Sequence, residues 1–177
     1  MGVAVAKRRA TYAELDALPD NLVGEIIDGE LVASPRPSPR HAMASSVLGG
    51  LLGPPFHFGE GPGGWLILDE PELHLGEHVL VPDLAGWRRE RVTELPEGPA
   101  WIIAPDWVCE VLSPGTEARD RTRKLRIYAE EGVGHAWLID PALKTLEVFR
   151  REGARWLLVA AFEGDVKVRA EPFDAVE

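Results

Sequence analysis

The central stretch of the chain combines two patterns of apolar residues: short continuous runs, which are typical of buried strands, and helical spacing between them. Residues 107–112 read WVCEVL, an apolar run before Ser-Pro-Gly that is typical of a buried strand. Residues 116–131 carry apolar positions at helical spacing and end at Gly132, which predicts a helix. Residues 136–140 read AWLID and predict a second buried strand. A strand, a helix and a strand in this order predict a crossover unit with two parallel strands.

One charged residue breaks the apolar pattern of the first strand. Glu110 lies inside the run, where a carboxylate is costly to desolvate unless it is paired, protonated or bound to a cation. On the predicted helix, Asp120, Lys124 and Tyr128 recur every four residues and share one stripe. The crossover therefore brings Lys124 toward Glu110. Both a cation site and a structural ion pair with Lys124 explain Glu110 at this stage.

Shorter predicted elements surround the crossover unit. Residues 11–18 match a capping box followed by a short helix, and residues 25–32 match a hairpin with an Asp-Gly turn. Residues 39–52 carry an apolar helical face behind the N-cap Ser38. Further strands are expected at 65–69, 72–75, 78–81, 145–150, 155–162 and 166–168, with a loop at 53–64. The whole pattern predicts an α/β fold, or α+β in stricter terms, with a mixed sheet flanked by helices.

The composition is that of one soluble globular domain. With 177 residues, of which 45% are hydrophobic and 27% charged, we expect a flexible arm over residues 1–10 and a single domain over residues 11–177. No apolar run is long enough to cross a bilayer, and the first ten residues lack the pattern of a secretory signal. The single cysteine, Cys109, is expected as a buried thiol. These features predict a cytoplasmic protein without membrane contact.

Charge is distributed unevenly along the chain. The net charge of −10 argues against a protein that coats nucleic acid through bulk charge. A local basic surface is still expected on the crossover helix, where Arg121 is a candidate phosphate contact, although such a run is more often a solvated face. His41, near a helix N-terminus, is a candidate phosphate contact or general base, with a capping or core role as the alternative.

Two carboxylates on neighbouring strands suggest a metal site. Asp83 follows Pro82 directly before an apolar strand, and Glu110 lies within the next buried strand. A pair of such oxygens suits Mg²⁺ or Mn²⁺, which lowers the pKa of a bound water and stabilises charge on a scissile phosphate. Lys124 nearby would orient the water or offset that charge. In the alternative, Asp83 is a turn residue and Lys124 a solvated helix lysine.

Other chemistries find little support in the sequence. The GEGPGG of the 53–64 loop does not match a phosphate-binding fingerprint. His74 and His78 are four residues apart, but the HExxH pattern is absent, and across the predicted hairpin the two are not expected to face one site. A Ser-His-Asp or Cys-His set is not expected, because histidines are few and Cys109 is predicted to be buried.

The order of several short motifs resembles that of the Uma-two family of endonucleases. The motifs are EIIDGELV at 25–32, SPRH at 38–41, VPDL at 81–84, EVLSP at 110–114, the Asp120, Lys124 and Tyr128 spacing, Gly132-Val133 and WLIDP at 137–141. Members of this family are small bacterial proteins, abundant in cyanobacteria, in the PD-(D/E)XK nuclease superfamily. The resemblance covers about residues 11–165 and implies the restriction-endonuclease-like fold.

The resemblance also implies roles for individual residues. Asp83 matches the acid of the Pro-Asp motif, and Glu110 matches the acid of the second motif. Glu25 matches an N-terminal acid that often completes the metal site. The lysine expected two residues after the second acid is replaced by Leu112, and the family's helix lysine is here Lys124. A catalytic set of Asp83, Glu110, Lys124 and Glu25 follows, with the three acids as ligands of Mg²⁺ or Mn²⁺.

Three functions remain as hypotheses. The first is a metal-dependent nuclease on DNA, expected to be a homodimer because cutting two strands requires two sites. The second is a degenerate nuclease-fold module that binds nucleic acid or a protein partner without catalysis. The third is a structural homodimer subunit in a larger complex, for which six tryptophans, several expected in surface loops, leave room for an interface.

Overall fold

Two mixed sheets form the frame of the molecule. The computed structural model describes residues 8–177, so residues 1–7 of the expected arm lie outside the described part. The strands of the six-stranded sheet are β3 (Trp65–Asp69), β6 (Leu84–Arg88), β8 (Trp107–Val111), β9 (His135–Asp140), β10 (Thr145–Glu152) and β11 (Arg155–Glu163). Those of the five-stranded sheet are β1 (Leu22–Ile27), β2 (Glu30–Pro35), β4 (Glu72–Leu75), β5 (His78–Leu80) and β7 (Ala100–Trp101). Their orders are β11-β10-β9-β8-β6-β3 and β2-β1-β5-β4-β7, which confirms the predicted mixed α/β fold.

The crossover unit has the predicted connectivity. Strands β8 and β9 pair in parallel, with Trp107 opposite His135. The predicted helix between them is present as α3 (Glu117–Arg119), the π-helical turn η2 (Asp120–Lys124) and α4 (Leu125–Glu130). The sequence pattern did not predict the π-helical turn. Such turns often occur at functional sites, and this one contains two buried charged residues, Asp120 and Lys124.

The two faces of β8 belong to different hydrophobic clusters. Val108 packs with Tyr128 of α4 on one face, whereas Trp107 and Cys109 pack on the other face. Because side chains alternate along a strand, Glu110 points to the same face as Val108. The period of the strand therefore directs the one carboxylate of β8 toward the crossover helix.

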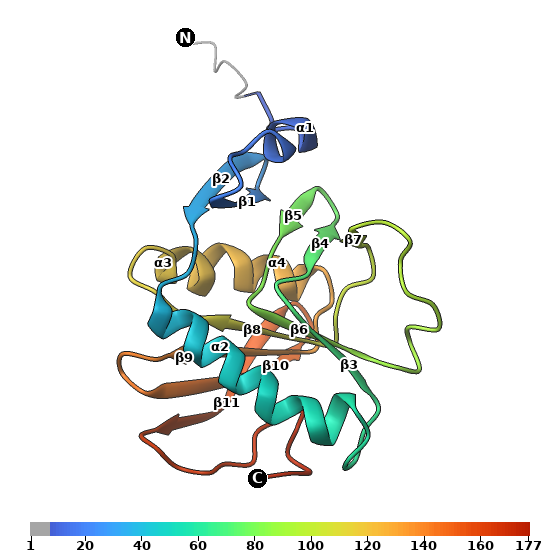
Figure 1. The fold of residues 1–177 in the computed structure, drawn as a ribbon, viewed down its shortest axis with the longest axis vertical. Coiled ribbons are helices and arrows are strands. Elements are labelled where there is room, and N and C mark those ends of the chain that lie inside the picture. The colour runs from blue at the N-terminus through green and yellow to red at the C-terminus, as the bar shows by residue number, and fades with distance from the viewer. Residues whose placement is uncertain (1–7) are drawn as a thin grey trace.

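Helix α2 (Pro39–Leu52) lies across the sheet on the face opposite α4, as Figure 1 shows. Its start is as predicted, because the Ser38 side chain accepts a hydrogen bond from the backbone N–H of His41. Its C-terminal end packs through Leu52 into the cluster of Trp107 and Cys109. Within the described part of the chain, no helix has both the length and the apolar character needed to span a bilayer.

The segment after α2 differs from the predicted loop at 53–64. Its first residues form a π-helical turn, η1 (Gly53–His57), closed by a hydrogen bond from the N–H of Phe58 to the carbonyl of Gly53. Phe56 is buried in this turn, with its ring 4.8 Å from that of Phe173. Tertiary packing of one aromatic residue thus orders a stretch whose glycines and prolines suggested a loop.

The N-terminal hairpin is as predicted and belongs to the second sheet. Strands β1 and β2 pair in antiparallel register around Asp28 and Gly29, whose φ angles are 53° and 74°. Two left-handed residues in a two-residue loop form the favoured hairpin turn. Strand β1 also pairs with β5 through Ile26 and Val79, which fixes the hairpin to the rest of the chain.

The predicted helix before the hairpin is also present. Helix α1 (Tyr12–Asp16) begins with the Thr11 and Glu14 capping box. Just before it, the N–H of Ala10 donates to the carbonyl of Gly29. The described end of the expected arm is therefore held against the hairpin turn.

The strand predicted at 166–168 is absent, because this segment does not pair with a sheet. Val166 is 61% exposed. The following residues are held by side chains instead: the Trp137 indole donates to the carbonyl of Glu171, and Phe173 is buried among aromatic rings. An apolar run of three residues was too short to distinguish a strand from an irregular packed segment.

The expectation of tryptophans in surface loops is wrong. Five of the six are buried, namely Trp65, Trp87, Trp101, Trp107 and Trp137. Four of these lie in strands of the six-stranded sheet, and Trp101 lies in the short strand β7 of the other sheet, where its ring stacks on that of Trp87 at 4.3 Å. The tryptophans therefore build the core and give no support to an interface.

Candidate active site

One cavity collects most of the charged residues that the sequence singled out. It has a volume of about 440 Å³ and lies between the hairpin strands, the start of α2, the ends of β6 and β8, and the crossover helix. Its acidic lining residues are Glu25, Glu70, Asp83, Glu110 and Asp120. Its permanently cationic lining residues are Arg36, Arg119 and Lys124. Carboxylates therefore outnumber these cations by five to three.

The ammonium group of Lys124 occupies the centre of this arrangement. Its Nζ lies 2.8 Å from an Oε of Glu110 and 2.9 Å from an Oε of Glu25. It also donates to the carbonyl oxygen of Val81 at 3.1 Å. Lys124 is 2% exposed, so all three of its donors are satisfied inside the protein.

Each carboxylate in contact with Lys124 is held by a second hydrogen bond. The hydroxyl of Tyr128 donates to Glu110 at 2.6 Å, and the backbone N–H of Val81 donates to Glu25 at 2.9 Å. The sequence placed Tyr128 on one helical stripe with Lys124, and the structure identifies Glu110 as the partner of its hydroxyl. These bonds fix the two acids in rotamers that point at the lysine.

Asp83 lies next to this cluster but has its own partners. Leu84 is paired with Cys109 across β6 and β8, which brings the preceding residue, Asp83, beside Glu110. One oxygen of Asp83 accepts from the N–H of Val111 at 2.6 Å. The other lies 3.2 Å from Nε2 of His41. The hydrogen bond to Asp83 raises the pKa of His41, which favours the charged imidazolium.

Burial and mutual repulsion dominate the electrostatics of the cavity. Burial raises the pKa of Glu110 well above 4.5; the charge of Lys124 opposes this, while Asp120 and Asp83 add to it. Burial also raises the pKa of Asp120. For Lys124, burial lowers the pKa, but the charges of Glu110 and Glu25 outweigh burial and raise it overall. The cavity thus holds one firmly charged ammonium in an excess of acids.

The predicted site residues are brought together with one exception. Glu25, Asp83, Glu110, Lys124 and His41 all line the cavity. Arg121 does not line it and instead forms ion pairs with Glu117 and Glu147 on the outside of the helix.

Two lining residues on the crossover helix were not predicted as site residues. The sequence placed Asp120 on one stripe with Lys124 but did not count it among the site residues, although this four-residue spacing was a usable signal for a shared face. Arg119 has no comparable spacing signal, because it precedes the unpredicted π-helical turn that changes which residues share a face.

The donor chemistry fits a hard divalent cation, but the present rotamers do not form a finished metal site. Carboxylate oxygens of Glu25, Asp83 and Glu110 are the ligand type that Mg²⁺ and Mn²⁺ prefer. Among residues 8–177, however, no three His, Cys, Asp or Glu side chains converge as a metal-binding group. The geometric reason is that the Lys124 ammonium lies between two of the three acids.

The comparisons place the chain among nuclease-like proteins, and a family model gives the family. The chain belongs to the Uma2 family, whose model is described as "Putative restriction endonuclease" and matches residues 10–176. Among solved structures, the chain is similar to a crystal structure described as a "putative nuclease belonging to DUF820" from Anabaena variabilis. The TM-score is 0.75 at 24% identity over 94% of this chain and 92% of that one, which establishes the shared fold. No curated protein matches the chain.

The raised pKa of Glu110 predicts the pH dependence of stability. A carboxyl whose pKa is higher in the folded state stabilises the fold below its unfolded pKa and loses this contribution as the pH rises through the folded pKa. The advantage of the wild type over Glu110→Gln in free energy of unfolding should therefore shrink above pH 4.5, by at most about 1.4 kcal/mol per pH unit.

Urea unfolding of both proteins between pH 4 and pH 8 measures this difference. The control is Glu130→Gln, which removes an exposed carboxylate paired with Arg126. It shows how much of the change in the free energy of unfolding follows from the loss of any negative charge. If the free energy of unfolding of the wild type instead rises relative to that of Glu110→Gln as the pH rises, the prediction is wrong. Lys124 would then stabilise the Glu110 carboxylate more strongly than burial destabilises it.

Proposed function

We propose that this protein is a divalent-metal-dependent nuclease that hydrolyses phosphodiester bonds of DNA through a site of the PD-(D/E)XK type. The observation that carries the proposal is the cavity in which Glu25, Asp83 and Glu110 meet the buried Lys124. Membership of a family described as restriction endonucleases supports the reaction class. The shared fold with a solved DUF820 protein supports the architecture.

The charge balance of the cavity supports metal dependence. A DNA strand is a polyanion, and the acids of the cavity outnumber its permanent cations. Asp83 and Glu110, with Glu25, would hold Mg²⁺ or Mn²⁺. The ion would supply positive charge at the scissile phosphate and a bound water of lowered pKa.

The protein's own residues have separable tasks in this proposal. Tyr128 holds Glu110 in its rotamer through a 2.6 Å hydrogen bond. Lys124 stays charged across the physiological pH range and offers N–H donors to a phosphate oxygen or to the attacking water once they turn from Glu25 and Glu110. His41, held by Asp83 at the start of α2, would contact a phosphate as the imidazolium that this hydrogen bond favours.

The alternative function is a module that binds nucleic acid or a protein partner without cutting. The specific observation that favours it is the complete satisfaction of Lys124 by Glu25, Glu110 and Val81. A lysine so bound is an adequate structural counterion and needs no metal. Such a module would keep its affinity for a ligand in the presence of a chelator.

Cleavage assays on single-stranded and duplex DNA separate these functions. We expect the wild type to nick DNA with Mg²⁺ or Mn²⁺ and to be inactive with EDTA. Asp83→Asn and Glu110→Gln should reduce the rate at least about 100-fold, because each removes a ligand charge, the scale of loss typical for a single catalytic electrostatic contact.

The matched control is Glu130→Gln, which removes a carboxylate of α4 that lies outside the cavity, and it should cleave like the wild type. DNA binding that persists in EDTA, with no cleavage under any metal, would replace the nuclease with the binding module. Equal cleavage by all variants would place the activity elsewhere.

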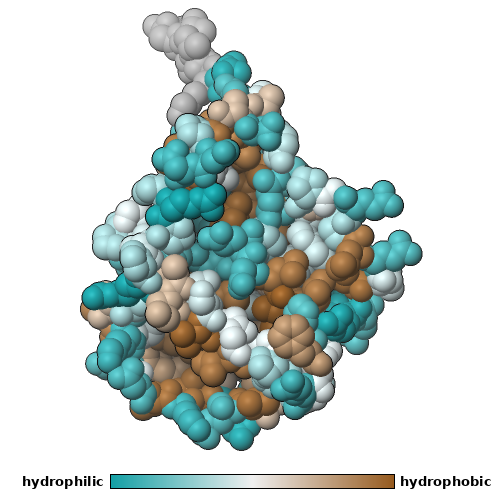
Figure 2. Space-filling model, in the orientation of Figure 1, coloured by the Kyte–Doolittle hydropathy of each residue, from teal (hydrophilic) through white to brown (hydrophobic). Residues whose placement is uncertain are grey.

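A second copy of the chain is the partner that we propose for duplex cleavage, since two strands require two sites. Helix α2 exposes an apolar stripe, which we call the α2 stripe: Met43 is 65%, Val47 50% and Leu51 67% exposed. The three residues are four positions apart, so they form one face. Figure 2 shows hydrophobic residues gathered on the lower part of the same side of the molecule.

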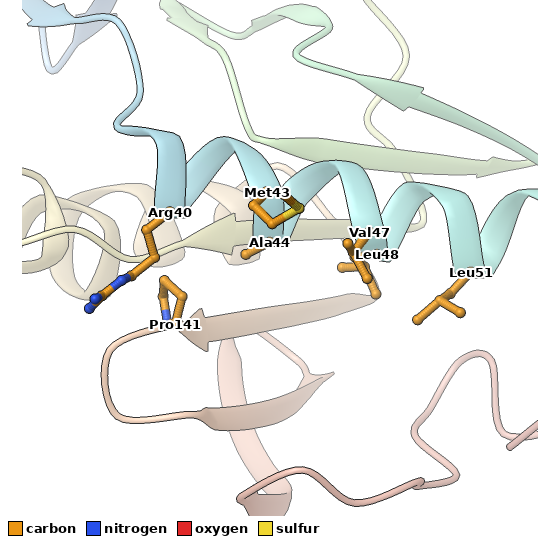
Figure 3. Close-up of a pocket in the computed structure, with 7 residues that line it drawn as sticks. All are labelled: Arg40, Met43, Ala44, Val47, Leu48, Leu51 and Pro141. Carbon is orange, nitrogen blue, oxygen red and sulfur yellow. The ribbon is translucent and has the colours of Figure 1, made fainter.

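The geometry of the α2 stripe suits packing against a copy of itself. Figure 3 shows its side chains beside Pro141, around a hollow of about 430 Å³ with Arg40 at one end. The first turn of the same helix carries His41 into the cavity. Pairing of two α2 helices would therefore fix two cavities relative to one another.

Light scattering coupled to size exclusion tests this proposal. The wild type should elute with the mass of a dimer, and Val47→Glu should elute as a monomer, because a charge on the stripe would be buried without a partner. Ile102→Glu is the control, since Ile102 is 78% exposed directly after β7 and does not belong to the α2 stripe, and it should remain dimeric. A monomeric wild type, or a dimeric Val47→Glu, would refute the α2 stripe as the interface.

A further inference from the structure

The arginines of the crossover helix differ in how fully they are paired. Arg121 contacts Glu117 and Glu147, and its side chain lies outside the cavity. Arg123 pairs with Asp28 and Glu30, and Arg126 pairs with Asp28 and Glu130. These three guanidinium groups are committed to the outer surface, where carboxylates already neutralise them.

Arg119 is the exception within this helix. Within residues 8–177, its guanidinium forms one hydrogen bond, from an Nη to the neutral hydroxyl of Ser34 at 3.1 Å. Its nearest carboxylates, those of Glu25 and Asp120, lie at 3.7 Å and 3.9 Å, beyond hydrogen-bond length. Its Nε is buried and has no hydrogen-bond partner. A guanidinium with five donors is therefore largely uncommitted, although its side chain is only 17% exposed.

The surroundings of Arg119 supply further neutral donors. Ser34 and the pair Ser113 and Thr116, whose hydroxyls are 3.0 Å apart, line the same cavity. These hydroxyls come from the β2 strand and from the turn after β8. Hydroxyl groups and a guanidinium fork are the usual side-chain partners of backbone phosphates in nucleic-acid complexes.

We propose that Arg119 is the residue that binds a backbone phosphate of the DNA strand in this cavity, with its guanidinium fork on the non-bridging oxygens. The inference rests on the proposed function and names a residue that would hold the strand beside the proposed metal site. Arg119 does not take part in bond breaking; it positions the strand beside Glu25, Asp83 and Glu110. This assigns to Arg119 the phosphate contact that the sequence suggested for Arg121.

A purely structural role for Arg119 makes a different prediction. As a counterion of Glu25 and Asp120, Arg119 would affect stability and the acids, but it would add nothing to the ionic-strength dependence of DNA binding. A direct phosphate contact releases a counterion and steepens the dependence of affinity on salt. The salt slope therefore distinguishes the two roles.

The experiment measures DNA binding by fluorescence anisotropy, with a labelled single strand and a labelled duplex, across about 50–200 mM salt. Ca²⁺ replaces Mg²⁺ in one series and EDTA is present in the other. Arg119→Ala should weaken binding about tenfold at the lowest salt and reduce the slope of log K against log salt by about 0.7–0.9. Arg121→Ala, which removes the same charge from the outer face of the helix, should leave the slope unchanged.

A second variant guards against loss of folding. Arg119→Lys keeps the charge but not the fork, so it should restore the slope while recovering only part of the affinity. Melting temperatures of all variants show whether each is folded under the assay conditions. If Arg119→Ala does not fold, the comparison of Arg119→Lys with the wild type carries the test, because loss of the fork alone should lower the affinity.

The outcomes separate this inference from the proposed function. If the wild type binds and cleaves DNA while the Arg119 variants match it in affinity and slope, Arg119 is not the phosphate contact and the nuclease stands. If Arg121→Ala loses as much DNA affinity and salt slope as Arg119→Ala, the strand lies on the outer face of the helix and the inference is wrong. If the wild type neither binds nor cleaves DNA, the inference and the proposed function fail together.

Discussion

The buried ammonium of Lys124 is the interaction on which the candidate site depends. It joins Glu25 of the N-terminal hairpin, Glu110 of the central sheet and the Val81 carbonyl between β5 and β6 to one turn of the crossover helix. Four segments that are distant in sequence therefore meet at one positive charge. Removing a partner from a buried ion pair typically costs about 3–5 kcal/mol, because the remaining charge is left uncompensated. The contacts of Lys124 therefore both hold the segments around the cavity in place and determine the charge inside it.

This constraint connects stability to the proposed chemistry. The acids that Lys124 neutralises are the donors that a divalent cation would need, so a structural counterion and a metal compete for the same oxygens. Burial raises the pKa of Glu110, and repulsion from Asp120 and Asp83 adds to this, so the cavity favours the binding of a positive charge. Arg119, which is the least committed arginine of the helix, adds a donor for a phosphate at the edge of this acidic centre.

Much of the architecture follows from local sequence signals, whereas part of the site does not. A carboxylate inside an apolar strand identified Glu110, and the four-residue spacing on the next helix identified Lys124, because both signals concern residues that are close in sequence. Glu25 was found only through the family resemblance, since its contact with Lys124 joins residues about a hundred positions apart. The π-helical turn at Asp120–Lys124 has no such signal, so Arg119 was missed in favour of Arg121. Burial of the tryptophans likewise depended on tertiary packing that composition does not encode.

The most direct test of the account is the thermal stability of the wild type and Lys124→Met, each with and without Mg²⁺ or Mn²⁺. A ligand that binds only the folded state raises its stability, so a metal that competes with Lys124 should stabilise the variant more than the wild type. The account predicts that Lys124→Met melts lower than the wild type in EDTA and recovers much of the difference when metal is added. A variant as stable as the wild type would contradict the central role of the buried ammonium. A melting temperature that metal leaves unchanged in both proteins would contradict the carboxylates as a metal site.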